Sequence, residues 1–191
     1  MIKNKADSFM EVKKDNITAY TIYFEQSFEN LSEKIMELGS NTRKICIVSD
    51  TNVSSLYKEE IEERLLPVCR KVVSYTFIAG EQHKNLETVK DLYRFLIEQK
   101  FDRKDLLIAL GGGVTGDLTG FAAATYLRGI DFIQIPTTLL AQVDSSIGGK
   151  TGVDFDCYKN MVGAFHQPKM VYINISTLKT LSNEQFYCGM G

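Results

Sequence analysis

Three consecutive glycines, Gly111–Gly113, separate a short apolar run at 105–110 from a segment of helical character at 114–127. A strand that turns through glycines into a helix presents unpaired backbone N–H groups, and a phosphate can approach them closely because no Cβ intervenes. The pattern therefore predicts a nucleotide phosphate site at this turn. Asp117, in the first turn of the helix, either complements the helix dipole or contacts the ligand.

The glycines also satisfy the pattern G-x-G-x-x-G over 111–116. In the usual dinucleotide fingerprint this pattern lies on the first strand-to-helix turn, with an acid about 20 residues later for the ribose. Here it follows a later strand, and the acids Asp50 and Glu81 lie upstream. Either the match is accidental, or a cofactor lies across the sheet in a different arrangement.

A second glycine-rich stretch, 144–151, superficially resembles a P-loop. It has an acid where the pattern needs glycine, and a helical turn in place of the preceding strand, so we reject that interpretation. Lys150, Lys159 and Asn160 lie close together in sequence and are either solvated or bind an anionic substrate, for which lysine supplies a mobile point charge. Arg128 lies at the end of the predicted helix, where it either interacts favourably with the negative end of the helix dipole or binds a second anionic group.

Alternating strands and helices must position these residues. Runs of β-branched and apolar residues predict strands at 17–24, 44–50, 72–78, 105–110, 132–135 and 170–173. One-sided apolar periodicity predicts helices at 28–38, 86–99 and 114–127, with two short amphipathic pieces before Pro67 and a helical turn through Leu139-Leu140. The stretch 148–168 is predicted as loop or hairpin, and Ser176 as the cap of a short last helix.

This alternation is typical of right-handed βαβ units and predicts an α/β fold with a doubly wound, mostly parallel, Rossmann-like sheet. Such sheets bind ligands at the carboxyl ends of their strands. The predicted strands end near Asp50, Glu81, Gly111–Gly113, Thr137 and Thr138. We therefore expect these residues to converge on one crevice.

Composition limits the classes of function. The chain has 191 residues, 44% of them hydrophobic, so it can form one domain with a substantial core. A net charge of −2 argues against nucleic-acid and membrane-surface partners. The four cysteines have no paired spacing, and the N-terminus has no signal-peptide pattern, so we expect reduced thiols and a cytoplasmic protein. We predict a domain at 1–176 and the start of a second, truncated domain at 177–191.

Four segments carry a resemblance to a known family: GEQHK at 80–84, GGGVTGDLTGFAAATYLRG at 111–129, IPTTLLAQVDSSIGGKTGV at 135–153 and KNMVGAFHQP at 159–168. Together they resemble the 3-dehydroquinate synthase family. The shorter pattern GGGxxxD is shared with iron-type polyol and glycerol dehydrogenases. The last two segments resemble the synthases rather than the dehydrogenases.

The resemblance implies an NAD- and metal-dependent lyase of the shikimate pathway, which converts 3-deoxy-D-arabino-heptulosonate 7-phosphate to 3-dehydroquinate and phosphate. NAD+ would oxidise a ring hydroxyl transiently and be regenerated in each turnover. The resemblance also implies a cytoplasmic homodimer and a missing all-helical C-terminal domain. The zinc or cobalt ligands would lie beyond Gly191, none of them in this chain, so the chain alone should not catalyse.

The resemblance further implies site residues. Those for the cofactor are Asp50, Glu81, Lys84, Gly113, Val114, Thr115, Gly116, Asp117, Thr137, Thr138, Leu140, Lys150, Lys159, Thr177, Leu178, Lys179 and Thr180. Those for the substrate and the chemistry are Asp144, Lys150, Lys159, Asn160 and Arg128, the last reaching a substrate phosphate across the dimer interface. The alternatives are an iron-type polyol dehydrogenase, another sugar phosphate cyclase, and an NAD-binding module without catalysis.

Overall fold

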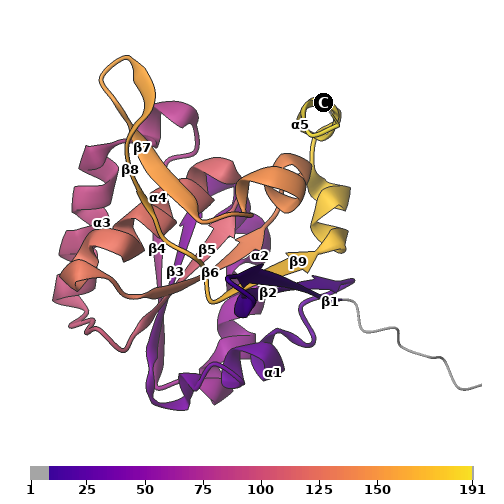
Figure 1. Cartoon of the computed structure of the whole chain (residues 1–191), viewed down its shortest axis with the longest axis vertical. Helices are drawn as coiled ribbons and strands as arrows, with labels where there is room; N and C mark the ends of the chain where they lie inside the picture. Colours follow the sequence, from indigo (N-terminus) through magenta and orange to yellow (C-terminus); the bar gives the residue numbers. More distant parts are fainter. Residues whose placement is uncertain (1–8, 191) are drawn as a thin grey trace, which may run out of the picture.

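A seven-stranded sheet forms the centre of the computed structural model, which describes residues 9–190 (Figure 1). Its strand order is β1-β2-β9-β6-β5-β3-β4, and all neighbouring strands are parallel except the pair β1 and β2. The strands are β1 (Phe9–Lys14), β2 (Ile17–Glu25), β3 (Lys44–Asp50), β4 (Lys71–Phe77), β5 (Leu106–Gly111), β6 (Asp131–Pro136) and β9 (Met170–Asn174). The predicted mostly parallel sheet is confirmed.

Helices cover both faces of this sheet. They are α1 (Leu31–Met36), α2 (Thr51–Leu65), α3 (Leu86–Glu98) and α4 (Gly113–Thr125). Alternate residues of β3 show the two layers, because Ile45 and Ile47 belong to the core under α1 and α2, whereas Cys46 and Val48 belong to the core under α3 and α4. Since β3 is buried on both faces, its central residues 45–48 form a continuous apolar run, as a central parallel strand should have.

Several predicted elements differ from the structure. The two amphipathic pieces before Pro67 are one continuous helix, α2, and the Asp50 carboxylate caps its first turn by accepting from the N–H groups of Asn52 and Val53. Helix α1 is only six residues long, although Phe28 before it still packs into the core. Strand β1, which is mostly exposed, was not predicted.

The predicted cap at Ser176 is wrong. Asn174 is the cap of the 3₁₀ turn at Ile175–Thr180, and its side-chain oxygen accepts from the N–H of Ser176. The predicted boundary at 176 falls inside this turn, and the division into two domains stays a prediction. A short helix, α5 (Asn183–Cys188), follows, and Gly191 lies outside the described residues.

A separate two-stranded hairpin, β7 (Lys150–Phe155) and β8 (Tyr158–Phe165), lies over α4 and projects above the sheet in Figure 1. Gly120 allows this close approach, because a Cβ there would collide with the Thr151 methyl group and lie 3.1 Å from the Phe132 ring. The hairpin is joined to the carboxyl end of β6 by a π-helical turn at Ala141–Ser145. Within residues 9–190, no helix has the length and apolar character needed to cross a membrane.

Candidate functional site

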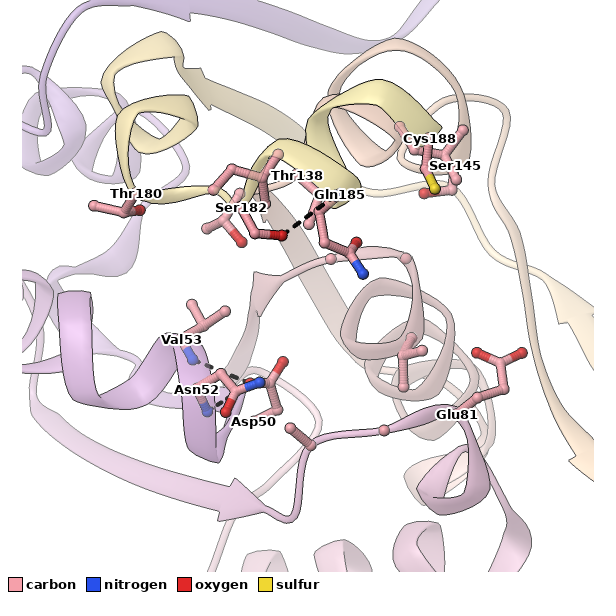
Figure 2. A pocket seen from close by; sticks show the side chains of 18 of the residues that line it. Asp50, Asn52, Val53, Glu81, Thr138, Ser145, Thr180, Ser182, Gln185 and Cys188 are labelled. Atoms are coloured by element: carbon pink, nitrogen blue, oxygen red, sulfur yellow. Dashed lines mark hydrogen bonds between the residues drawn. The ribbon is translucent and has the colours of Figure 1, made fainter. Parts of the chain in front are cut away.

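A cavity of about 740 Å³ lies at the carboxyl ends of the parallel strands. It is lined by the end of β3, the segment after β4, the start of α4, the end of β6 and the C-terminal turns (Figure 2). The predicted site residues in its wall are Asp50, Glu81, Lys84, Gly113, Val114, Asp117, Thr137, Thr138, Leu140 and Thr180. The strand ends thus converge on one crevice, as the sequence predicted.

The first turn of α4 forms the floor of this cavity. Gly112 is the N-cap and has no side chain, so no side-chain hydrogen bond caps the first turn of the helix. A Cβ on Gly112 would lie 3.1 Å from the Thr138 methyl group, and one on Gly113 would lie 3.0 Å from the Ser145 hydroxyl. Among the described residues, the buried hydroxyl of Thr137 has no hydrogen-bond partner. Unpaired donors and absent Cβ atoms make this turn suitable for an anionic group.

Thr115 and Gly116, in the same turn, are buried and serve packing. The Thr115 hydroxyl donates to Asp50 Oδ2 at 3.3 Å and so ties α4 to the end of β3. A Cβ on Gly116 would lie 2.5 Å from Gln134 Oε1, so the missing side chain lets α4 approach β6. These two residues can contribute to a ligand mainly through their backbone.

Lys84 is the most buried charged residue in the cavity wall, with a side chain only 5% exposed. Its Nζ lies 2.5 Å from Asp117 Oδ2 and 2.6 Å from Asn160 Oδ1. Burial raises the pKa of the Asp117 carboxyl above its ordinary value, while the hydrogen bond and positive charge of Lys84 act in the opposite direction. We infer a Lys84–Asp117 ion pair within a hydrogen-bonded cluster of three side chains.

A second cavity, of about 510 Å³, lies between the π-helical turn and the hairpin. Asp144, Lys150 and Asn160, all predicted to meet the substrate, line it together. Asp117 and Ser145 line both cavities, so the two spaces share a wall. The structure thus places a site with both acidic and basic groups next to the larger cavity.

Other predicted residues lie less centrally. Lys159 is 72% exposed and sits 3.4 Å from the Glu81 carboxylate, and Arg128 is exposed at the end of α4. Within 177–180 only Thr180 lines the larger cavity, whereas Thr177 is buried and its hydroxyl accepts from Gln142. The roles of all these residues stay predictions.

The sequence analysis missed several residues in the walls of the cavities. Asn52 and Tyr57 come from α2, and Ser182, Gln185 and Cys188 come from the last helix, with Gln185 facing the cavity opposite Asp50 in Figure 2. Asn52 could have been found, because it lies two residues after Asp50, the end of a predicted strand. The residues of α5 carried no such signal.

The N-terminal model of the 3-dehydroquinate synthase family matches residues 74–188. A 3-dehydroquinate synthase from Acetivibrio thermocellus is 49% identical over 172 residues, which are 90% of this chain and 48% of that protein. One from Ruthia magnifica subsp. Calyptogena magnifica is 49% identical over 173 residues, 90% of this chain and 47% of that protein. The chain therefore spans about half the length of the curated relatives it matches.

Solved structures with the same fold include a 2-deoxy-scyllo-inosose synthase complexed with carbaglucose-6-phosphate, NAD+ and Co2+. It has a TM-score of 0.81 and 29% identity, over 90% of this chain and 46% of that chain. The 2-epi-5-epi-valiolone synthase ValA from Streptomyces hygroscopicus, with NAD+ and Zn2+ bound, has a TM-score of 0.80 and 28% identity, over 95% and 50% of the two chains. An iron-containing alcohol dehydrogenase, at 15% identity over 86% of this chain and 48% of that chain and a TM-score of 0.70, shares the fold alone.

Proposed function

This chain belongs to the 3-dehydroquinate synthase family, and we propose that it is the NAD+-binding part of an enzyme that converts 3-deoxy-D-arabino-heptulosonate 7-phosphate to 3-dehydroquinate and phosphate. The observation that carries the proposal is the uncapped glycine turn of α4 at the floor of a large cavity. Two structures at 28–29% identity that contain bound NAD+ support the choice of cofactor.

The residues of the larger cavity fit a dinucleotide. The backbone of Gly112, Gly113 and Val114 would hold the pyrophosphate against the start of α4, where N–H groups and the helix dipole favour negative charge. The Thr137 hydroxyl, buried and without a described partner, would gain one from the ligand. Asp50 Oδ1 caps α2, and Oδ2, which accepts from the Thr115 hydroxyl at 3.3 Å, can accept a further hydrogen bond from a ribose hydroxyl. NAD+ bound there supplies reversible hydride transfer to the neighbouring site.

The second cavity fits a small anionic substrate that also needs proton transfer. Lys150 supplies a positive charge for phosphate or carboxylate, and Asp144 supplies a carboxylate that can accept a proton. Asn160 offers an amide that can orient a hydroxyl. Residues 9–190 contain no group of three or more His, Cys, Asp or Glu that could bind a metal ion, so no metal ligand is assigned there and no step depends on one.

Calorimetric titration with NAD+ tests the cofactor assignment. Wild-type chain is expected to bind NAD+ saturably, and Gly113→Val to weaken binding at least about tenfold, or about 1.4 kcal/mol. The valine side chain would extend from a Cβ already 3.0 Å from the Ser145 hydroxyl and would block close approach to the turn.

Lys90→Met is the matched surface control for this titration, since Lys90 is 54% exposed and pairs with Glu87 on the surface of α3, outside both cavities. It should bind NAD+ like the wild type. A folded wild-type chain that takes up no NAD+, or a Gly113→Val variant that binds it unchanged, would contradict the proposed site.

A second candidate is another sugar phosphate cyclase reaction, because the synthases of 2-deoxy-scyllo-inosose and 2-epi-5-epi-valiolone share this fold over 90% or more of the chain. Identity favours the first proposal, at 49% against 28–29%. Assays of a full-length protein carrying this sequence, with each substrate in turn, would decide between them.

A further inference from the structure

Lys84 lies where the two cavities meet. It lines the larger cavity, Asn160 lines the smaller one, and Asp117 lines both. The ammonium group of Lys84 donates to Asp117 on α4 and to Asn160 on the hairpin, at 2.5 and 2.6 Å. A single buried side chain therefore bridges the proposed cofactor site and the proposed substrate site.

The backbone reinforces this bridge. The N–H of Asp154 donates to the carbonyl of Lys84 at 2.8 Å, and the N–H of Asn160 donates to Asp154 Oδ1 at 2.8 Å. Asn160 has a left-handed backbone with φ of 57°, a conformation that asparagine tolerates better than most residues. Residues 84 and 154 together thus fix both the backbone and the side chain of Asn160.

The burial of Lys84 distinguishes it from a lysine that serves only to attract an anion. A buried ammonium is costly unless it is paired and hydrogen-bonded. Lys84 satisfies that requirement inside the protein, whereas Lys159 nearby is 72% exposed and forms an ion pair with Glu81 at the surface. Holding Asp117 and Asn160 in place is therefore the role that the geometry of Lys84 supports.

We propose that Lys84 is a positioning residue that couples occupancy of the NAD+ cavity to the placement of Asn160 in the substrate cavity. The inference rests on the proposed function. NAD+ in the larger cavity excludes water from the cluster of Lys84, Asp117 and Asn160, which lowers the local dielectric. The hydrogen bond from Lys84 to Asn160 then becomes stronger. The hairpin is then held more firmly when the cofactor is present.

Amide hydrogen exchange on the 191-residue chain tests this coupling. The reporters are the N–H groups of Asp154 and Asn160, and the N–H of Gly116, which bonds to the carbonyl of Gly112, reports on the cofactor turn. In the wild type, saturating NAD+ is expected to slow exchange at all three, at the two hairpin amides by about tenfold. In Lys84→Met, at an NAD+ concentration that again saturates, Gly116 should still gain protection and the hairpin amides should not.

Lys90→Met serves as the control and should behave like the wild type. A loss of protection without ligand in Lys84→Met would show only a structural role, so the measured quantity is the change that NAD+ causes. If Lys84→Met does not fold, Asn160→Gly tests the same link, since glycine accepts the left-handed backbone but removes the Oδ1 acceptor. It should likewise lose NAD+-dependent protection at Asp154.

The outcomes separate the two proposals. Protection of Gly116 by NAD+ with equal hairpin protection in wild type and Lys84→Met overturns the coupling and leaves the cofactor assignment intact. Protection of Gly116 with no hairpin effect in the wild type overturns the coupling as well. A wild-type chain in which NAD+ protects no amide overturns the proposed function, and the coupling with it.

Discussion

At the scale of single residues, Asp117 has a consequence for stability. Burial raises the pKa of its carboxyl above the ordinary value of 3.8, with Lys84 acting against that change. The folded chain therefore binds this proton more tightly than the unfolded chain, and the free energy of unfolding contributed by Asp117 rises as the pH falls. The contribution is fully present below 3.8 and is lost as the pH increases through the raised pKa.

Urea unfolding of wild type and Asp117→Asn, measured between pH 7 and pH 4, tests this sign. The difference in unfolding free energy should shift in favour of the wild type as the pH falls, because the asparagine variant lacks this titration. A shift in the opposite direction would mean that Lys84 outweighs burial at Asp117.

Single residues also show how far the sequence could predict the site. Asp50 ends one predicted strand, Gly113 and Thr138 follow two others by three residues, and in a parallel sheet such residues meet at one edge. The position of the Lys84 ammonium was not predictable in this way, because its partner Asn160 lies 76 residues away and reaches it only through the fold of the hairpin. Local spacing carries no information about such a contact.

At the scale of elements, the packing of the hairpin on α4 depends on Gly120. Gly120→Ala should lower the free energy of unfolding by about 1–3 kcal/mol, because the new methyl group collides with Thr151 and crowds Phe132. That cost should exceed the gain of up to about 1 kcal/mol from better helix propensity. Denaturant unfolding of the single variant measures the balance.

A second substitution identifies the cause. Thr151→Ser removes the colliding methyl group and keeps the hydroxyl that donates to the Ala164 carbonyl at 2.7 Å. Combined with Gly120→Ala it should restore part of the lost stability. Additive effects of the two substitutions would show that the collision does not determine the stability change.

Elements also differed in how well the sequence specified them. The central strands were predicted within about a residue, because burial on both faces makes them continuous apolar runs. Helix α2 was divided in the prediction because its pattern is weakly amphipathic, with only Ile61 and Leu65 fully buried. In the structure Asp50 caps its first turn, and Ile61 and Leu65 pack into the core beneath it.

At the scale of the whole molecule, the chain spans about half the length of its curated relatives, and we expect catalysis to need the other half. Purified chain supplied with NAD+, zinc or cobalt, and 3-deoxy-D-arabino-heptulosonate 7-phosphate should release no phosphate above background. The full-length relative from Acetivibrio thermocellus is the positive control. Steady phosphate release by the 191-residue chain would show that it carries the whole activity.

The order of strands in the sheet also governs how the chain reaches its structure. Strand β2 pairs with β9, with Thr21 opposite Met170. This early strand therefore cannot join the sheet before β9, the last strand that the structure describes, has been made. Strands β3 to β6 pair among themselves from nearer parts of the chain. Because non-local pairing is slow, we expect β1 and β2 to dock on the sheet last during synthesis. Until β9 has emerged from the ribosome, the edge of β6 with which it pairs would be available for other contacts.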